Sequence, residues 1–202
     1  MGFSAVCRSA PVPDARTLSN PLSGNIMGKI RFPEAALLFI GALYSDPEVF
    51  FQSNRILEKT LGDSLLVTPP LPWDYSAYYR DELGSPIKRQ FIFFNSLFDT
   101  GTLADIKIIT NEIEASFSLN GKRRINLDPG YITLAKIVLA STKNYSHRIN
   151  LGKGIYGEIT LLYIEKEGTF KKHLFTYRDY QEKSCIDMFL NARAILKKML
   201  IP

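Results

Sequence analysis

Cysteine and histidine are scarce in this sequence. Among its 202 residues there are two cysteines, Cys7 and Cys185, and two histidines, His147 and His173. Zinc sites generally use three or four Cys, His or carboxylate ligands at characteristic spacings, which do not occur here. Two distant cysteines provide no disulfide framework either. The sequence therefore argues against a zinc centre and against a disulfide-rich scaffold.

Long hydrophobic runs are also missing. The longest apolar run, residues 35–44, is well below the roughly 18 residues that span a bilayer. The best apolar stretch near the N-terminus, residues 3–6, is too short for the core of a secretory signal peptide. We therefore expect a cytoplasmic protein without a membrane partner.

The composition is that of a globular chain, with 46% hydrophobic, 22% charged and 12% aromatic residues. Residues 1–26 differ, because they show no helical or strand periodicity and contain Pro11, Pro13, Pro21 and Gly24. We expect residues 1–26 to be a disordered or non-native tail and residues 27–202 to be a single α+β domain. The residues leave open whether Met1 or Met27 is the native start.

The first part of the domain predicts alternating strands and helices. A helix is expected from Ser45 to residue 61, since Ser45-Asp46-Pro47 is a typical helix start, and a second helix over 103–118. Apolar, β-branched runs predict the strands 35–42, 64–67, 87–96 and 122–127. The order strand, helix, strand, strand, helix, strand is that of a ferredoxin-like βαββαβ core.

The remaining chain predicts an extension of this sheet. Four further antiparallel strands are expected over 132–140, 147–151, 155–165 and 173–177. A C-terminal helix follows, with Asp179-x-x-Glu182 as its capping box and Asp179 as its N-cap. The aromatic segment 73–80 is expected to be a connector whose rings pack over a core edge.

Positive charge is concentrated in residues 122–154. This segment carries a net charge of +6, whereas the whole chain carries +5. Clustered cations attract anions, and arginine offers a planar fork for phosphate or carboxylate. We therefore expect an anionic small-molecule ligand, although each single cation could equally belong to a solvated surface. The expected ligand-binding residues are Arg124, Lys136, Lys143, Arg148 and, before the last helix, Arg178.

Two acids are the candidate catalytic residues, as a base or as Mg²⁺ ligands. Asp128 is the one acid inside the basic segment, and its alternative interpretation is a turn formed by Asp128-Pro129-Gly130. Glu158 opens an apolar strand and either faces solvent or points into the same site. His147 and Arg148 are expected on alternate faces of a strand, and Glu114 on a solvated helix face.

The segment Gly152 to Gly157 spells G-x-G-x-x-G. A dinucleotide site needs a helix to begin there, whereas the following residues are β-branched and strand-like. We therefore expect a glycine-rich hairpin turn at this position.

Five strings in the chain carry a family resemblance: YYRDELG (78–84), IKIITNEIE (106–114), RRINLDPGY (123–131), LASTKNYSHRINLGKGIYGEITL (139–161) and FTYRDY (175–180). With these strings the chain resembles the prokaryotic family known as domain of unknown function 4416, from about residue 30 to the C-terminus. The resemblance implies a free-standing domain of about the length of residues 27–202, which favours Met27 as the start, and it implies no activity.

Three functions remain open from the sequence. The first is binding or turnover of a phosphorylated small molecule of the nucleotide class at the basic segment. The second is an RNA-binding module, although an RNP1 signature is missing and the aromatic strand 91–94 is apolar enough to predict burial. The third is a protein-interaction domain without a ligand. Whether the chain is an enzyme, and its oligomeric state, are left open.

Overall fold

The structure is a computed structural model and describes residues 33–201. The expectations for residues 1–26 and for Met27 lie outside the described residues. The helices are α1 (Pro47–Leu61), α2 (Ala77–Leu83), α3 (Leu103–Ser116) and α4 (Lys183–Met199). The strands are β1 (Ala36–Tyr44), β2 (Ser64–Val67), β3 (Leu71–Pro72), β4 (Lys88–Phe98), β5 (Ile125–Ile132), β6 (Lys136–Ser141), β7 (Ile149–Gly152), β8 (Ile155–Ile164) and β9 (Thr169–Lys171).

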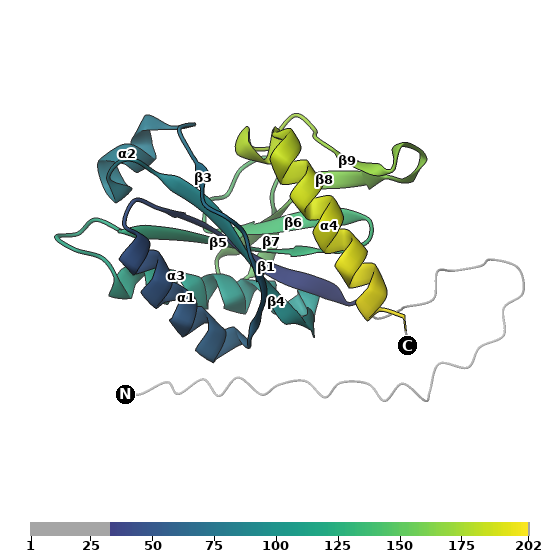
Figure 1. Cartoon of the computed structure of the whole chain (residues 1–202), viewed down its shortest axis with the longest axis horizontal. Coiled ribbons are helices and arrows are strands. Elements are labelled where there is room, and N and C mark those ends of the chain that lie inside the picture. Colours follow the sequence, from purple (N-terminus) through teal and green to yellow (C-terminus); the bar gives the residue numbers. More distant parts are fainter. Residues whose placement is uncertain (1–32, 202) are drawn as a thin grey trace, which may run out of the picture. The chain divides into compact units, whose positions relative to one another are not determined.

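All nine strands belong to one antiparallel sheet, so the described chain has the expected α+β class with further antiparallel strands and a C-terminal helix. The sheet has the order β2-β4-β1-β5-β6-β8-β7, with β3 beside β4 and β9 beside β8. In Figure 1, β4 runs between α1 and α4, which lie on its two sides. None of the helices in residues 33–201 is long and apolar enough to cross a membrane.

Local signals fix the first helix as predicted. The side chain of Asp46 accepts a hydrogen bond from the backbone N–H of Glu48 at 2.9 Å, and Pro47 occupies the first turn. Gly62, with φ of 99°, ends the helix in a conformation that a side chain would disfavour. The expected helix over 45–61 is therefore confirmed, and the helix expected over 103–118 is confirmed as α3.

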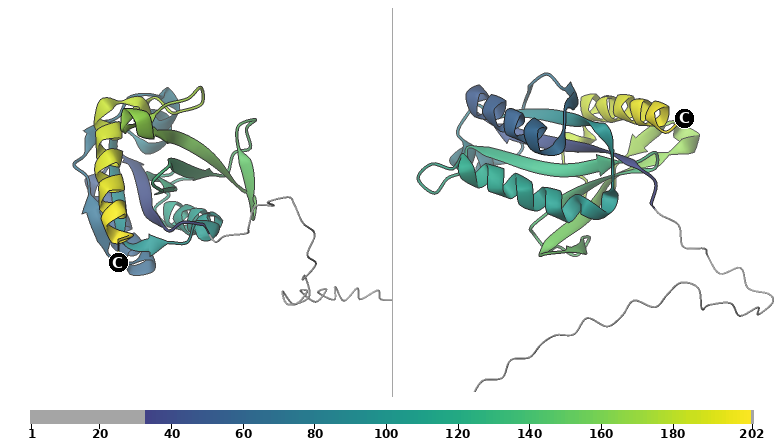
Figure 2. Two further views of the ribbon diagram at one scale, coloured as in Figure 1. Left: turned by 90° about the vertical axis from the view of Figure 1, so that its right-hand side faces the viewer. Right: turned by 90° about the horizontal axis from the view of Figure 1, so that it is seen from below.

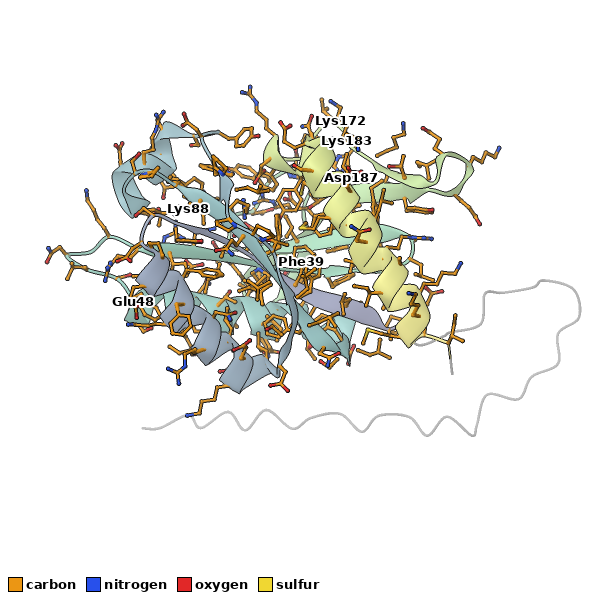
Figure 3. All side chains as sticks on the ribbon, in the orientation of Figure 1. Phe39, Glu48, Lys88, Lys172, Lys183 and Asp187 are labelled. Atoms are coloured by element: carbon orange, nitrogen blue, oxygen red, sulfur yellow. The ribbon has the colours of Figure 1, made fainter. Side chains whose placement is uncertain are left out.

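The central strand β1 is buried on both faces because helices cover each side. Phe39 packs with Phe91 of β4 and with Phe189 of α4, and Figure 3 places it in the middle of the molecule. The next residue, Ile40, belongs to the cluster formed with α1 and α3. The left view of Figure 2 shows α4 running along one side of the strands. Successive residues of β1 thus enter two separate cores.

Strands β5 and β6 pair over only part of their length. Gly130–Ile132 pairs with Ile137–Leu139, whereas β1 pairs with β5 over its whole length from Ile125 to Ile132. The edge of β5 from Ile125 to Pro129 therefore has no strand partner on the side of β6. Because the two neighbouring strands separate here, a gap remains in the sheet between this part of β5 and β6.

The interpretation of Asp128-Pro129-Gly130 as a turn is wrong, because these residues lie inside β5. Proline is tolerated there since β6 has already separated from β5 and one side of the strand makes no ladder bonds. Gly130 is required by close packing: an added Cβ would lie 2.5 Å from the carbonyl oxygen of Val138. The three residues therefore continue a strand that packs closely against β6, and they do not reverse the chain.

Two further expectations are corrected. Residues 77–83 form α2, ended by Gly84 with φ of 85°, so the segment 73–80 is not simply a connector. Trp73 does pack over a core edge, with Leu43, Leu83 and Ile87. Residues 173–177 are not a strand, and β9 lies earlier, at Thr169–Lys171. Side-chain hydrogen bonds hold this segment in place of a strand ladder, since Thr176 Oγ1 donates to the carbonyl of Thr160 at 2.7 Å and accepts from the backbone N–H of His173 at 2.9 Å.

Candidate functional site

A cavity of about 850 Å³ lies where β5 and β6 separate; we name it the central cavity. Its lining comes from β1, α2, β4, α3, β5, β6 and β8 and from the segments 73–76, 142–148 and 175–180. This volume suits a small-molecule ligand, since such sites usually measure roughly 300–1,000 Å³. The candidate site is therefore built by elements from nearly the whole described chain.

Six cations and four acids line the central cavity. Four of the cations each lie within 4.0 Å of one of the acids, so their charges are compensated. The pairs are Arg89 with Asp179 at 2.7 Å, Lys107 with Asp128 at 3.6 Å, Arg123 with Glu82 at 2.6 Å and Arg148 with Glu158 at 2.9 Å. The other two cations, Lys143 and Arg178, are exposed and make no ion pair with any residue in 33–201. We name these two residues the cationic mouth.

Arg89 lies on β4 and is only 6% exposed. Its Nη2 donates to Asp179 Oδ2 at 2.7 Å, and Trp73 Nε1 donates to the same oxygen at 3.0 Å. Asp179 therefore anchors two buried donors. The expected capping role of Asp179 is wrong, because α4 begins after Glu182 and its N-cap makes no side-chain bond.

Tyr180 follows Asp179 in the short 3₁₀ helix Asp179–Gln181 and is 1% exposed. Its ring packs against Phe91 and Phe189. Burial raises the pKa of its hydroxyl well above the ordinary value, so the group is a neutral phenol at physiological pH. The Tyr180 hydroxyl is thus an uncharged, buried group without a hydrogen-bond partner among the described residues.

Lys107, Glu114 and Arg123 form a buried charged network beside the cavity. Glu114 accepts from Arg123 Nη1 at 2.7 Å and from the backbone N–H of Leu127 at 2.7 Å. Lys107 Nζ donates to the carbonyl of Leu127 at 2.8 Å. The solvated position expected for Glu114 is therefore wrong, since its polar partners on β5 draw it inward.

Asp128 is the most exposed of the four acids that line the central cavity, with its side chain 30% exposed. Its Oδ2 accepts from Asn126 Nδ2 at 2.7 Å, and its Oδ1 lies 3.6 Å from Lys107 Nζ. Such partners keep a carboxylate oriented and leave lone pairs for a ligand.

Glu158 lies on β8 and points inward, so of the two orientations the solvent-facing one is excluded. Its Oε2 lies 2.6 Å from His147 Nε2 and accepts from Arg148 Nε at 2.9 Å. The expectation that His147 and Arg148 would not converge is wrong. Strand alternation does not apply to them, because β7 begins only at Ile149.

Arg148 uses four of its five N–H donors within the protein. Besides Glu158, it donates to Ser141 Oγ at 2.9 Å, to the carbonyl of Lys143 at 2.8 Å and to Tyr177 OH at 2.6 Å. These bonds tie the segment after β6 to the segment before α4. Arg148 therefore fixes the position of Lys143 at the mouth.

Of the predicted site residues, the structure brings five into the central cavity: Asp128, Lys143, Arg148, Glu158 and Arg178. Lys136 instead lines a second cavity of about 390 Å³ and does not join Lys143 and Arg148 in the central cavity. Arg124 lines neither cavity and pairs with Asp46 at 2.6 Å. The glycine-rich hairpin is confirmed, with Gly152, Lys153 and Gly154 all at positive φ between β7 and β8.

Aromatic rings form another part of the lining, from Trp73, Tyr78, Tyr79, Tyr145 and Tyr177. Tyr79 meets Trp73 edge to face with ring centroids 5.3 Å apart. The rings of the strand segment 91–94, in contrast, are buried in the two cores, as the sequence predicted. The exposed rings of Tyr78, Tyr145 and Tyr177 therefore belong to the cavity, whereas the rings of strand segment 91–94 offer no surface for stacking bases.

Sequence reasoning missed Gly41, Arg89, Lys107 and Tyr180 as lining or adjoining residues. One usable signal was present, since Lys107, Asn111 and Glu114 recur at helical spacing and define a polar stripe on α3. A lone arginine at the start of the apolar strand Lys88–Phe98 was a second signal.

In residues 33–201, no three His, Cys, Asp or Glu side chains gather as potential metal ligands. Mg²⁺ often binds one or two carboxylates together with substrate phosphates. A role of Asp128 as a Mg²⁺ ligand therefore stays a prediction.

Comparison with known proteins identifies the family of the chain but assigns it no activity. No curated protein and no solved structure matches the chain. A family model does match, over residues 34–195, and those residues include β1 and the complete lining of the central cavity. With four-fifths of its length matched, the chain belongs to the family described as Domain of unknown function (DUF4416).

Proposed function

We propose that the chain binds a phosphorylated small molecule of the nucleotide class in the central cavity. The observation that carries this proposal is the distribution of charge in the lining. Four cations are each paired with an acid, whereas the cationic mouth of Lys143 and Arg178 is unpaired among the described residues. A ligand with one anionic end and one neutral polar end matches this division.

The phosphate end belongs at the mouth. Two unpaired cations there raise the local concentration of anions, and an arginine guanidinium can bind phosphate through two parallel hydrogen bonds. The neutral end belongs in the compensated interior. Trp73 and Tyr79 supply aromatic faces for a planar ring, and Asn111 and Asn126 supply amide groups.

Of the two candidate catalytic acids, Asp128 is the one that a ligand can reach. The Glu158 carboxylate is 4% exposed and its Oε2 is engaged by both His147 and Arg148. Any proton transfer to or from a bound ligand is therefore assigned to Asp128, and Glu158 is assigned the role of positioning Arg148 and His147.

We also infer that about the first three-fifths of the domain, up to Ile132, form a ferredoxin-like core. Its elements are β1, α1, β2, β4, α3 and β5, in that order along the chain. The support is their sheet order, β2-β4-β1-β5, with antiparallel neighbours throughout and with α1 and α3 packed against the same cluster. The central cavity then lies where the added strands leave this core.

Calorimetric titration with uridine monophosphate and uridine tests the proposal, because the two differ only in the phosphate. We expect the monophosphate to bind more tightly by about 10-fold or more, the share that charge-assisted hydrogen bonds supply. The double variant Lys143→Gln/Arg178→Gln should lose this difference. The matched control Arg55→Gln/Lys166→Gln removes two exposed cations outside the cavity and should keep it.

Two results would contradict the proposal. If no nucleoside monophosphate binds, the cavity does not serve this ligand class. If a short single-stranded RNA binds tightly, loses roughly 0.7 log units of affinity per phosphate contact for each log unit of salt, and is weakened equally by both double variants, the RNA-binding alternative replaces it.

A further inference from the structure

The imidazole ring of His147 is oriented by a buried carboxylate. Its Nε2 lies 2.6 Å from Glu158 Oε2, and the same oxygen accepts from Arg148 Nε at 2.9 Å. Because a carboxylate accepts hydrogen bonds, Nε2 carries the hydrogen of the neutral ring and Nδ1 carries the lone pair. Glu158 therefore selects the tautomer of His147 as well as its position.

Aromatic neighbours also hold the ring of His147. Phe175 stacks on it with ring centroids 4.2 Å apart and an interplanar angle of 7°, and Tyr145 lies nearly parallel to it at 6.1 Å. Stacked rings contact the face of the imidazole. The lone pair of Nδ1 lies in the plane of the ring, so stacking does not cover it.

The Nδ1 atom of His147 is unpaired and accessible. It has no hydrogen-bond partner among residues 33–201, and the side chain is 18% exposed where the central and second cavities adjoin. The unpartnered side-chain atoms that are buried in this part of the chain belong to Asn54, Arg89, Thr160 and Tyr180. Since Nδ1 is unpartnered and is not one of these atoms, it keeps solvent-accessible surface.

Arg148 joins the cationic mouth to the carboxylate that holds this imidazole. Besides Glu158, its guanidinium binds the carbonyl of Lys143 at 2.8 Å and the hydroxyl of Tyr177 at 2.6 Å. Lys143 is one residue of the mouth, and Tyr177 directly precedes the other, Arg178. The two segments that carry unpaired cations and the carboxylate of the imidazole therefore meet at one side chain.

These groups together have the chemistry that phosphoryl transfer to histidine needs. An imidazole nitrogen with a free lone pair is a nucleophile. The ring becomes cationic when that lone pair forms a bond, and the Glu158 carboxylate beside Nε2 stabilises the cation, as the carboxylate of a catalytic triad does. The cations of the mouth offset the negative charge on the phosphoryl oxygens.

We propose that His147 Nδ1 accepts the terminal phosphoryl group of a nucleoside triphosphate, an inference that rests on the proposed function. The lone pair of Nδ1 forms the N–P bond, and the bond between phosphorus and the bridging oxygen breaks. That oxygen keeps the bonding electron pair and leaves as part of the nucleoside diphosphate anion. No proton passes between the ring and the ligand, and the hydrogen on Nε2 stays on the ring, held by Glu158.

Phosphohistidine has a chemical signature that tests this step. Its N–P bond is labile in acid and stable in alkali, whereas phosphate esters of serine and threonine are stable in acid. The full chain is incubated with Mg²⁺ and each common ribonucleoside triphosphate, radiolabelled at the terminal phosphate. We expect at least one of them to leave label on the protein that is lost in acid and retained in alkali.

The chain supplies a matched control, because its only histidines are His147 and His173. His147→Gln should lose the label, while calorimetric titration still detects binding of the triphosphate. His173→Gln should label like the natural chain, since His173 does not line the central cavity. The ring of His173 accepts the backbone N–H of Phe175 at 3.2 Å, and the side-chain oxygen of glutamine also accepts such a bond.

A second variant separates chemistry from structure. His147→Gly removes the ring and leaves a space beside Phe175 into which free imidazole fits. We expect added imidazole to restore the release of nucleoside diphosphate from the triphosphate, because the free ring then accepts the phosphoryl group.

The outcomes distinguish this inference from the proposed function. If the natural chain binds triphosphates but carries no acid-labile label, if the label persists in His147→Gln, or if imidazole has no effect on a folded His147→Gly that binds the triphosphate, the phosphohistidine inference is overturned and the proposed function stands. If no nucleotide binds in the parallel titration, the proposed function fails and this inference falls with it.

Discussion

Glu114 and Arg123 form a charge-assisted hydrogen bond of 2.7 Å between Oε2 and Nη1, and the carboxylate is almost fully buried. The other oxygen of Glu114 accepts the backbone N–H of Leu127 at 2.7 Å. Arg123 in turn makes two bonds, of 2.6 and 2.7 Å, to Glu82 on α2. One buried carboxylate thus connects α3, β5 and, through Arg123, α2.

Glu114→Ala should therefore destabilise the protein strongly. It leaves Lys107 with less compensation, one backbone N–H without its acceptor, and Arg123 without one partner. Removing one member of a buried ion pair costs about 3–5 kcal/mol. Urea unfolding measures the loss. The control Glu112→Ala lies two residues away on the exposed side of the same helix and should change stability by less than about 0.5 kcal/mol. Equal effects of the two variants would contradict the buried network.

Gly130→Ala should also destabilise, because β6 passes too close for a methyl group. The added carbon would lie 2.5 Å from the Val138 carbonyl oxygen and 2.6 Å from Phe39 Cζ. We expect a loss of about 2 kcal/mol or more in the free energy of unfolding. In the control Gly101→Ala, the nearest atom is a side-chain oxygen of Asp99 at 3.2 Å, so the loss should be smaller. A Gly130→Ala variant as stable as the natural chain would show that β5 and β6 leave room for a methyl group at this position.

Stability should fall in alkaline solution. Burial raises the pKa of Tyr180 and of Cys185 above their ordinary values of 10.0 and 9.0. Both groups ionise first in the unfolded chain, so the stability they contribute is complete below about pH 9 and is lost as the pH rises above it. Between pH 8 and pH 11, Tyr180→Phe should lose about 1.4 kcal/mol less than the natural chain in urea unfolding. Identical losses would mean that the phenol is not buried when folded.

Two arginines of the basic segment should behave differently. Arg124 pairs with Asp46 at an exposed site, so Arg124→Gln should cost less than about 1 kcal/mol and leave nucleotide binding unchanged. Arg148→Gln leaves the buried Glu158 without its arginine and frees the segment that carries Lys143, so it should cost about 3–5 kcal/mol and weaken binding. Unfolding and titration on both variants measure this contrast. If Arg124→Gln weakened nucleotide binding, the surface near Asp46 would be part of the binding site.

The elements that sequence predicted well are those set by neighbouring residues. Asp46 and Pro47 specify where α1 begins, and the glycines of the β7–β8 hairpin specify its turn, through backbone preferences that act within a few residues. The Asp128-Pro129-Gly130 string carries the same kind of signal, yet it is a strand. There the deciding facts are the pairing with β1 and the approach of Val138, which are distant in sequence.

The candidate site was predicted in part for the same reason. The excess of charge in residues 122–154 indicated the side of the molecule that Lys143, Arg148 and Asp128 share. The burial of Arg89 was not predictable from its neighbours, because its compensating carboxylate, Asp179, lies 90 residues away. Charge runs are visible in a sequence, whereas charge pairing is a property of the fold.

The lining of the central cavity runs along the chain from Leu43 on β1 to Tyr180 before α4, so no short part of the sequence contains the candidate site. Sites built from such non-local contacts form only when loop closure is complete, which is late in folding. Partly synthesised or cleaved chains should therefore be unable to take up the ligand. Conversely, ligand present at high concentration stabilises only the finished fold and slows its loss by mass action.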